Sequence, residues 1–549
     1  MTRCLRWFAC AALVVCIGLA AAASTEANET AASSASPTEQ DLTDAGASGE
    51  WLLPNHDYAS RRFSPLTQIR RDNVARLRLL CTYDFEDRNR FGANPLVHDG
   101  VLYVTSGDTT VALDAATCAV RWRHVWQGPG VASDPAARKT VTNAFKSRGA
   151  AIRDGKLVRP TSDSSLIALD LRSGRLLWSR TVALSSRQEF IVMAPLVHGN
   201  RVIVGIGIGE FSVRGWVGAF DLATGEPIWR FDTIPGDGQP GAETWSDAAI
   251  RSRGGGGVWV TPSLDARTGL LYVAVGNPVP DFHGDAREGS NLYTDSVVAL
   301  DAQSGELKWH RQFVPHDLHD WDLTIAGPLI EGGETAPPSI IVGGKDGLLR
   351  SVDRATGRLL FETEITTRSN VEAAPTIEGV HACPGVFGGM QWSHPAYHPG
   401  LALVIAPAVD WCGVYRKAAE LRQVPGQLFL GGSYTPDALA DAKGWLTAID
   451  ARSGAVRWRH SASRPMLAGV TVTASDLVFT GELTGEFLAL DAANGAVLYR
   501  HDTGTPLHAG IITYAKNGRQ YVAVTSGTAT SFWRAPSASS VVMVFGLPE

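Results

Sequence analysis

One short pattern occurs seven times along the chain, and this repeat constrains the fold more than any other feature. Each copy has an apolar pair, an Asp, a turn that usually ends in Gly, and an aromatic residue separated from the Gly by three positions. The copies read ALDAATCAVRW, ALDLRSGRLLW, AFDLATGEPIW, ALDAQSGELKW, SVDRATGRLLF, AIDARSGAVRW and ALDAANGAVLY, with Asp residues at 114, 170, 221, 301, 353, 450 and 491. Gly tolerates the positive φ of a tight turn and aromatic residues favour strands, so each copy predicts two strands joined by a turn.

A second strand pair precedes the copies, as in PLVHDGVLYVTS and PLVHGNRVIVGIG. Four-stranded units that recur along a chain are typical of propeller blades. The 97 residues between Asp353 and Asp450 leave room for one unmarked unit, which would bring the number to eight. We therefore expect an all-β fold, an eight-bladed β-propeller of four-stranded antiparallel blades over residues 49–549. A pair of β-sandwiches with chance similarity between strands is the alternative.

The first 23 residues place Arg3 and Arg6 before a short apolar run at 7–19 and a stretch of small residues. This order predicts a secretory signal peptide with cleavage near Ala23, and hence a periplasmic location. A membrane anchor is the alternative, but the apolar run is short for one. A lipoprotein site at Cys16 is a weaker alternative, because Val15 is bulky for the position before it. Residues 24–48, rich in Ala, Ser, Thr and acidic side chains, predict a flexible lead-in.

Composition excludes two further classes of partner. The net charge is −6, and loss of Arg3 and Arg6 with the signal would make it −8, so no broad basic field is available for nucleic acid. No segment after the signal approaches 18 uninterrupted apolar residues, so we expect no membrane span in the mature chain.

Four cysteines follow the signal: Cys81, Cys118, Cys383 and Cys412. An even number in an exported chain predicts two disulfides. The pairs Cys81–Cys118 and Cys383–Cys412 close short local loops and are favoured, although the other two connectivities remain open. No Cys-x-x-Cys-His sequence occurs, so no covalently attached haem is expected.

Oxygen-bearing side chains stand out in three separate motifs. The first motif, GIGIGEFSVRGWVGAFD, contains Glu210. The second, GGGGVWVTPSLDARTGLLYVAVGNP, contains Trp259 near its start and Asn277 as its next-to-last residue. The third, PHDLHDWDLT, contains Asp320 and Asp322. A lone carboxylate at a buried strand end such as Glu210 is costly without a partner. Asp320 and Asp322 would point to the same side of an extended segment.

Three other polar residues complete the candidate site: Arg148 in SRGAAIRDGKLV, Lys345 in GGKDGLL and Gln391 in CPGVFGGMQW. Taken with the repeats and the three motifs, the chain from Trp51 onward resembles the pyrroloquinoline quinone (PQQ) dehydrogenases, the eight-bladed quinoprotein alcohol dehydrogenases. The resemblance implies that Trp259 forms the floor under the quinone and that Arg148 and Lys345 bind it. Gln391 stands where the family usually has Asn.

The resemblance also implies a metal site and a catalytic base. Glu210, Asn277 and Asp320 would hold one ion, and Asp320 would accept the proton of the substrate hydroxyl, with Lys345 stabilising the quinone oxygen. Family members with a second Asp at the position of Asp322 resemble the lanthanide-using branch, so a lanthanide is favoured over Ca²⁺. The alternative places Asp322 outside the shell of ligands.

Several family features are missing. Thr142 and Asn143 occupy the positions of an adjacent-cysteine pair, and Gly92, Val192 and Gly207 replace polar residues of the quinone rim. A lid Trp reads as Leu467. Because of these departures, the chain has fewer of the family's quinone-contacting residues, whereas the residues that match the family's metal ligands are present.

These features together predict a periplasmic PQQ-dependent dehydrogenase that oxidises an alcohol or a related hydroxyl substrate with the help of a metal ion. A separate soluble cytochrome c would accept the electrons. A non-catalytic propeller that acts as a scaffold or binding protein is the alternative. An enzyme that oxidises a sugar or a polyol is a third possibility, with the same chemistry and different pocket walls.

Overall fold

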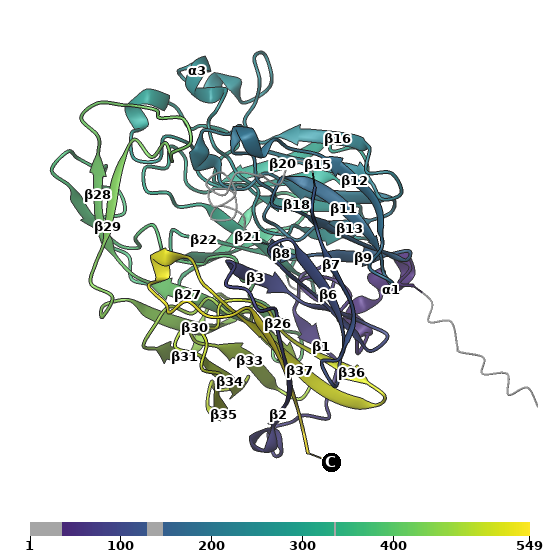
Figure 1. The fold of residues 1–549 in the computed structure, drawn as a ribbon. Coiled ribbons are helices and arrows are strands. Elements are labelled where there is room, and N and C mark those ends of the chain that lie inside the picture. The colour runs from purple at the N-terminus through teal and green to yellow at the C-terminus, as the bar shows by residue number, and fades with distance from the viewer. Residues whose placement is uncertain (1–35, 129–146, 334–335, 549) are drawn as a thin grey trace, which may run out of the picture. The chain divides into compact units, whose positions relative to one another are not determined.

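The computed structural model describes residues 36–128, 147–333 and 336–548, and over these residues the fold is a β-propeller (Figure 1). Eight antiparallel sheets of four strands form the blades, and one of them gains a short fifth strand. The predicted all-β, eight-bladed architecture is confirmed.

The blades follow one another along the chain. The first four consist of β4 (Leu96–His98), β5 (Val101–Ser106), β6 (Thr109–Asp114) and β7 (Val120–Val125); β9 (Ala151–Arg153), β10 (Lys156–Pro160), β11 (Ser165–Asp170) and β12 (Leu176–Thr181); β13 (Leu196–His198), β14 (Arg201–Gly205), β15 (Trp216–Asp221) and β16 (Pro227–Asp232); and β17 (Ser263–Asp265), β18 (Leu270–Ala274), β19 (Ser296–Asp301) and β20 (Leu307–Gln312).

The other four consist of β21 (Leu323–Ile330), β22 (Ser339–Gly344), β23 (Leu348–Asp353) and β24 (Leu359–Glu364); β26 (Ala396–His398), β27 (Leu403–Asp410), β30 (Lys443–Asp450) and β31 (Val456–Ala462); β32 (Thr471–Thr473), β33 (Leu477–Gly481), β34 (Glu486–Asp491) and β35 (Val497–Asp502); and β36 (Ile511–Lys516), β37 (Arg519–Ser526), β38 (Val541–Gly546) and β2 (Arg78–Asp84). The short β1 (Phe63–Ser64) pairs in parallel with β32.

The repeat forms the turn between the third and fourth strands of a blade and joins that blade to its neighbour. Gly174 adopts φ +69°, and a Cβ there would lie 2.5 Å from the ring of Trp122 in the preceding blade, so no other residue fits. The indole of Trp122 donates a hydrogen bond to the carbonyl oxygen of Leu171 in the same turn (3.1 Å). The same bond joins Trp178 to Leu222, Trp229 to Ala302 and Trp458 to Ala492. The repeated aromatic residue is therefore the contact between blades.

The unmarked blade lies at the end of the chain, so its predicted place between Asp353 and Asp450 was wrong. The last blade takes β36, β37 and β38 from the C-terminal part and its fourth strand, β2, from the N-terminal part. No turn can join β38 to β2, so the repeat cannot occur there. The long interval instead holds an inserted sheet of β25 (Val380–Ala382), β28 (Gly413–Lys417) and β29 (Gly432–Pro436).

Both predicted disulfides are present, and Cys81–Cys118 lies where the ring closes. Cys81 is on β2, the fourth strand of the last blade, and Cys118 occupies the Gly position of the first repeat. At the other junctions this position packs against an aromatic ring. At the closure a covalent bond takes the place of that contact, which explains why the first repeat has Cys instead of Gly.

Replacing both Cys81 and Cys118 with Ser should lower the free energy of unfolding. The disulfide closes a loop of sequence separation 37, for which the loss of chain entropy predicts about 4 kcal/mol. Denaturant unfolding of the oxidised protein measures the difference. The matched control replaces Cys383 and Cys412, with a similar separation of 29 but no role at the closure. An effect at Cys81–Cys118 smaller than that of the control would contradict this role.

The remaining elements are short. The pair β3 (Phe91–Asn94) and β8 (Ser147–Gly149) is parallel. The helices are α1 (Glu39–Thr43), α3 (Ala248–Arg251) and the 3₁₀ turns η1 (Ala45–Ala47), η2 (Val74–Arg76), η3 (Ser185–Arg187), η4 (Gly209–Phe211), η5 (Ala242–Thr244), η6 (Gly284–Arg287) and η7 (Ser531–Trp533). Within the described ranges, none of these helices has the length and apolar character that a membrane crossing requires.

The segment before the propeller differs from expectation. Residues 1–35, with the predicted signal peptide and the first part of the lead-in, lie outside the described residues. The rest of the lead-in, 36–48, was predicted to be flexible but is folded against the blades. Leu42 is fully buried, and Glu39 accepts hydrogen bonds from the backbone N–H of Gly199 (3.0 Å) and the hydroxyl of Tyr58 (3.2 Å). Its polar composition concealed buried apolar side chains, such as Leu42 and Ala45, and one well-partnered carboxylate.

Candidate active site

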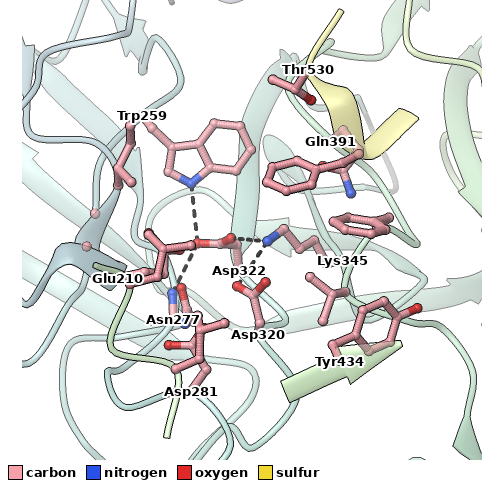
Figure 2. A pocket seen from close by; sticks show the side chains of 18 of the residues that line it. Glu210, Trp259, Asn277, Asp281, Asp320, Asp322, Lys345, Gln391, Tyr434 and Thr530 are labelled. Atoms are coloured by element: carbon pink, nitrogen blue, oxygen red, sulfur yellow. Dashed lines mark hydrogen bonds and ion pairs between the residues drawn. The ribbon is translucent and has the colours of Figure 1, made fainter. Parts of the chain in front are cut away.

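A cavity of 830 Å³ opens beside the ends of several blade strands, and the three motifs contribute to its lining. Glu210 comes from η4 after β14, Trp259 from the loop before β17, and Asn277 from the loop after β18. Asp320 and Asp322 precede β21, and Lys345 follows β22. Figure 2 shows these side chains converging from separate strands and loops. The fold thus brings together residues that are 135 positions apart in the sequence.

Three carboxylates form the centre of the site. One oxygen from each of Glu210, Asp320 and Asp322 lies within 4.8 Å of the others. Burial and the charge of Asp322 raise the pKa of Glu210, while Lys345 opposes this shift. Carboxylates this close repel one another unless a cation lies between them.

Asp317 shapes the loop that presents two of these carboxylates. Its side chain accepts hydrogen bonds from the backbone N–H groups of His319 (2.9 Å) and Trp321 (2.7 Å). Burial raises the pKa of Asp317 to about 6. Asp320 adopts φ +57°, so this segment is not the extended strand assumed from the sequence. Asp320 and Asp322 nevertheless reach the same centre, because the loop curls around Asp317.

The carboxylate of Asp322 is held by three donors. Its Oδ1 accepts hydrogen bonds from the backbone N–H of Asn277 (3.1 Å) and the indole of Trp259 (3.3 Å) (Figure 2). Its Oδ2 lies 2.6 Å from Nζ of Lys345. A Cβ on Gly276 would lie 2.1 Å from Oδ1, so this approach requires glycine at 276. Asp322 therefore connects Trp259 with Asn277 and Lys345.

Lys345 is the cation of the centre. Its Nζ lies 3.0 Å from Asp320 and 2.6 Å from Asp322. Burial alone would lower the pKa of Lys345, but these carboxylates and Glu210 raise it above its usual value. One ammonium group cannot balance three buried carboxylates, so the centre is short of positive charge.

The donor set fits a hard metal ion. Asn277 donates from Nδ2 to the carbonyl oxygen of Pro278 (3.2 Å), which leaves its amide oxygen to bind an ion. Carboxylate and amide oxygens are the ligands that Ca²⁺ prefers, and a trivalent ion of similar hardness would offset more of the negative charge. The residues present therefore fit the ion that the sequence implied.

Arg148 lies between two indole rings and lacks a counter-ion. Its guanidinium carbon is 5.0 Å from the ring centres of both Trp259 and Trp392. The side chain is 8% exposed, and Nε and Nη1 have no hydrogen-bond partner among the described residues. Burial lowers the pKa of Arg148 to about 9. A buried, unpaired guanidinium beside aromatic rings fits an aromatic acid such as PQQ, whose carboxylates would supply the missing charge.

The other predicted positions vary in their placement. Gln391 lines the cavity and donates from Nε2 to Gly388 (2.8 Å). Val192 also lines it, whereas Leu467 is packed in an apolar cluster with Trp533. Thr142 and Asn143 lie outside the described residues.

Sequence reasoning missed many residues of the cavity, among them Asp281, Trp392 and Trp533. Trp392 directly follows Gln391, so the motif that gave Gln391 contained the signal for it. Trp533 comes from η7 in the C-terminal loop. This loop lies outside every repeat, so its sequence contained no signal for Trp533. Asp281 lies four residues after Asn277, and an acidic residue in a loop is too common to be informative.

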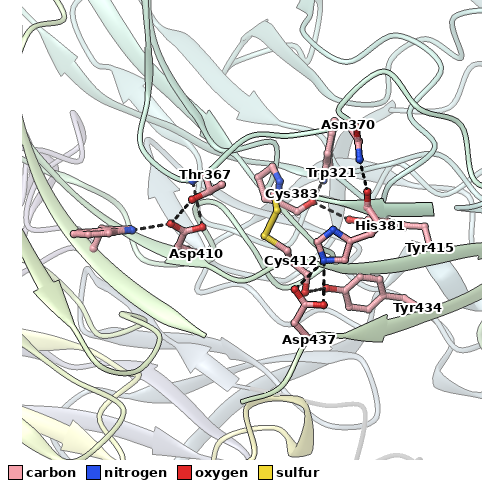
Figure 3. The surroundings of a disulfide bond; sticks show 12 residues. Trp321, Thr367, Asn370, His381, Cys383, Asp410, Cys412, Tyr415, Tyr434 and Asp437 are labelled. Atoms are coloured by element: carbon pink, nitrogen blue, oxygen red, sulfur yellow. Dashed lines mark hydrogen bonds and ion pairs between the residues drawn. A yellow bond between two sulfur atoms is a disulfide. The ribbon is translucent and has the colours of Figure 1, made fainter. Parts of the chain in front are cut away.

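The second disulfide, Cys383–Cys412, lies near Trp321, the residue between Asp320 and Asp322 (Figure 3). The indole of Trp321 donates to the carbonyl oxygen of Pro384, the residue after Cys383 (3.2 Å). Tyr434, which lines the cavity, donates from its hydroxyl to the carbonyl oxygen of Cys412 (3.0 Å). The disulfide therefore joins the ends of β25 and β28 within the inserted sheet, and the hydrogen bond of Trp321 connects this sheet with the loop of Asp320 and Asp322.

Comparisons with known proteins agree with the fold. A family model described as the glucose/ethanol/alcohol dehydrogenase β-propeller domain matches residues 51–374. A second model, described as outer membrane protein assembly factor BamB, matches residues 442–546. Quinohemoprotein alcohol dehydrogenase ADH IIB of Pseudomonas putida is 33% identical over 88% of this chain and 74% of its own length.

Two further relatives extend the likeness. The dehydrogenase subunit of alcohol dehydrogenase (quinone) from Gluconacetobacter polyoxogenes is 33% identical over 87% of this chain and 71% of its own length. The structure of a europium-containing methanol dehydrogenase superposes with a TM-score of 0.84 at 26% identity, covering 92% of this chain and all of that one. The likeness to dehydrogenases extends over almost all of the described chain, while the assembly-factor model covers only its last part. The chain therefore belongs to the PQQ-dependent (quinoprotein) alcohol dehydrogenase family and is an oxidoreductase of that family.

Proposed function

We propose that this protein oxidises an alcohol or a related hydroxyl-bearing substrate in the periplasm, with PQQ and one metal ion bound in the cavity. The observation that carries this proposal is the convergence of Glu210, Asp320 and Asp322 within 4.8 Å beside Lys345. The names of its relatives, alcohol and methanol dehydrogenases, support the substrate class.

The metal ligands in this proposal are Glu210, Asn277, Asp320 and Asp322. When bound, PQQ would supply the two-electron acceptor for a hydride from the alcohol carbon, and the metal ion would supply a Lewis acid. A lanthanide is favoured over Ca²⁺ because Asp322 adds a third carboxylate, and the europium-containing relative supports this choice. Trp259 and Arg148 would bind the quinone by its ring and by its carboxylates, and Gln391 would contact its edge.

Asp320 is the base in this mechanism. Burial raises the pKa of its carboxyl well above the usual value, and Asp322 and Glu210 add to the shift, while Lys345 opposes it. A carboxylate with a raised pKa accepts a proton more readily, so Asp320 takes the proton of the hydroxyl as the hydride leaves the carbon. The alcohol thus loses one proton and one hydride and becomes an aldehyde or a ketone. Lys345 holds Asp320 in place and places positive charge where the reduced quinone oxygen would develop negative charge.

The proposal also covers the export of the protein and the acceptor of its electrons. The signal-like residues 1–23 support export, and a separate soluble cytochrome c is our proposed electron acceptor.

Reconstitution tests the proposal directly. The exported protein, loaded with PQQ and either Ca²⁺ or a light lanthanide such as La³⁺, should reduce an artificial dye in the presence of primary alcohols. Absorption spectra and metal analysis of the same samples report quinone and ion binding independently of turnover. A protein that binds both and oxidises none of the alcohols would exclude the proposed substrate class, and one that binds neither would exclude the proposed site.

A further inference from the structure

A fourth carboxylate faces the cavity and has no role in the mechanism above. Asp281 lines the cavity and is 1% exposed, and within the described part of the chain neither of its carboxylate oxygens has a hydrogen-bond partner. A buried carboxylate without a donor is costly, so it calls for an explanation, such as a group that binds there. Burial and the charges of Asp320 and Glu210 raise the pKa of Asp281 well above its usual value, while Arg287 and Lys345 oppose the shift.

The backbone around Asp281 is fixed by neighbours that leave its side chain unpaired. The guanidinium of Arg287 donates to the carbonyl oxygens of Pro280 (2.9 Å) and Asp281 (3.0 Å), not to the carboxylate. The backbone N–H of Phe282 donates to the carbonyl oxygen of Leu430 (2.8 Å). The segment is therefore held rigidly, and the orientation of Asp281 follows from the fold.

Asp281 does not belong to the group that would hold the metal ion. That group, with oxygens within 4.8 Å of one another, consists of Glu210, Asp320 and Asp322. Figure 2 shows Asp281 on the side of these acids away from Trp259, the predicted floor of the quinone. Its partner must then come from the part of the cavity that is left for the substrate.

Much of the cavity wall is apolar. Phe282, Val386, Phe387, Leu428 and Leu430 supply apolar surface that suits a carbon chain. A simple alkyl alcohol would cover this surface but leave the Asp281 carboxylate without a donor. A substrate with a donor group of its own would satisfy it.

We propose that Asp281 is a specificity-determining residue that accepts a hydrogen bond from a second donor group, a hydroxyl or an ammonium, on the alcohol substrate. This inference rests on the proposed function and narrows its substrate class. A site built to pair with a polar group discriminates strongly against analogues that lack it, because the site's own group is then left unpaired.

Three substrates of equal carbon number test the preference: 1-propanol, 1,3-propanediol and 3-amino-1-propanol. The holoenzyme should show a kcat/KM about 10- to 100-fold higher for one or both of the latter two, the range expected for a hydrogen bond to a charged group. The D281L variant should lose this preference and retain 1-propanol oxidation. The D281N variant should retain a preference for the diol but lose one for the ammonium, which distinguishes the two donors.

Two readouts do not depend on turnover. Calorimetric titration of the loaded protein with each compound measures binding without turnover. The preference for a second donor group can therefore be refuted even if the protein reduces the dye, and it can be tested even if the protein does not. At a pH at which Asp281 is ionised, the D281N variant should also unfold at a higher temperature than the native protein, because an unpaired buried charge is removed. The matched control E420Q changes an exposed acid and should alter neither readout. Equal substrate ratios or equal affinities in native protein and D281L would overturn the inference.

Discussion

Replacing Asp320 with Asn should lower kcat by about 1,000-fold while quinone and metal remain bound. Asn is nearly isosteric and keeps an oxygen for the ion, but it cannot take the proton of the hydroxyl, a role worth about 10²- to 10⁴-fold. Lys345 would lose one carboxylate partner and keep Asp322, which lies 2.6 Å away. Dye reduction measures kcat, and quinone absorbance and metal content are measured on the same sample.

The matched control is D72N, an Asp-to-Asn change at an exposed side chain that pairs with Arg70 on the surface. It should leave kcat, quinone content and metal content unchanged. Retention of more than a tenth of native kcat in D320N would show that another group is the base. Loss of the metal in D320N would show that Asp320 acts mainly as a ligand.

Replacing Asp322 with Ala should abolish the advantage of a lanthanide. The variant keeps two carboxylates, Glu210 and Asp320, whose summed charge matches a divalent ion better than a trivalent one. We expect La³⁺ affinity to fall by at least about 10- to 100-fold, whereas Ca²⁺ affinity changes less. Metal titrations followed by activity and by bound metal measure both ions in the same variant.

The Ca²⁺ arm is the internal control, because Asp322 also contacts Lys345 and Trp259. If Asp322 only positions these two residues, activity with both ions should fall by the same factor. A variant with undiminished La³⁺ affinity would place Asp322 outside the ligands and remove the argument for a lanthanide.

The repeat allowed the blades to be predicted because its residues act locally and between adjacent units. Asp114 illustrates the local part: its carboxylate accepts hydrogen bonds from the backbone N–H groups of Ala116 and Thr117 and so forms the turn. Trp122 illustrates the second part, since its partner lies in the next copy of the same pattern. A motif that carries both halves of a contact can be recognised without a structure.

The eighth blade shows where this reasoning fails. Its third and fourth strands come from opposite ends of the chain, so the turn that the pattern describes does not exist there. Spacing alone suggested a blade between Asp353 and Asp450, because an inserted sheet and a missing blade occupy similar lengths of sequence. Pairing between distant strands, such as β2 with β38, is decided only when the ring closes.

The candidate site divides in the same way. Motifs identified the acids Glu210, Asp320 and Asp322, and also Trp259, Arg148 and Lys345, because each has a distinctive sequence around it. The loop geometry of Asp320, the indole of Trp392 over Arg148 and the unpaired carboxylate of Asp281 were not. Each depends on which side chains from remote segments come within a few ångströms, and no local pattern encodes that.

The sequence by itself determined the repeating blade, favoured the two disulfide pairs that the structure contains, and identified the candidate oxygen donors, since each is expressed within a short stretch or by the spacing of like residues. Only the tertiary structure decided how the ring closes, which acids share one centre and which acid is left without a partner. The physical reason is that burial and charge balance are properties of a whole neighbourhood, and this neighbourhood is assembled from loops of several blades.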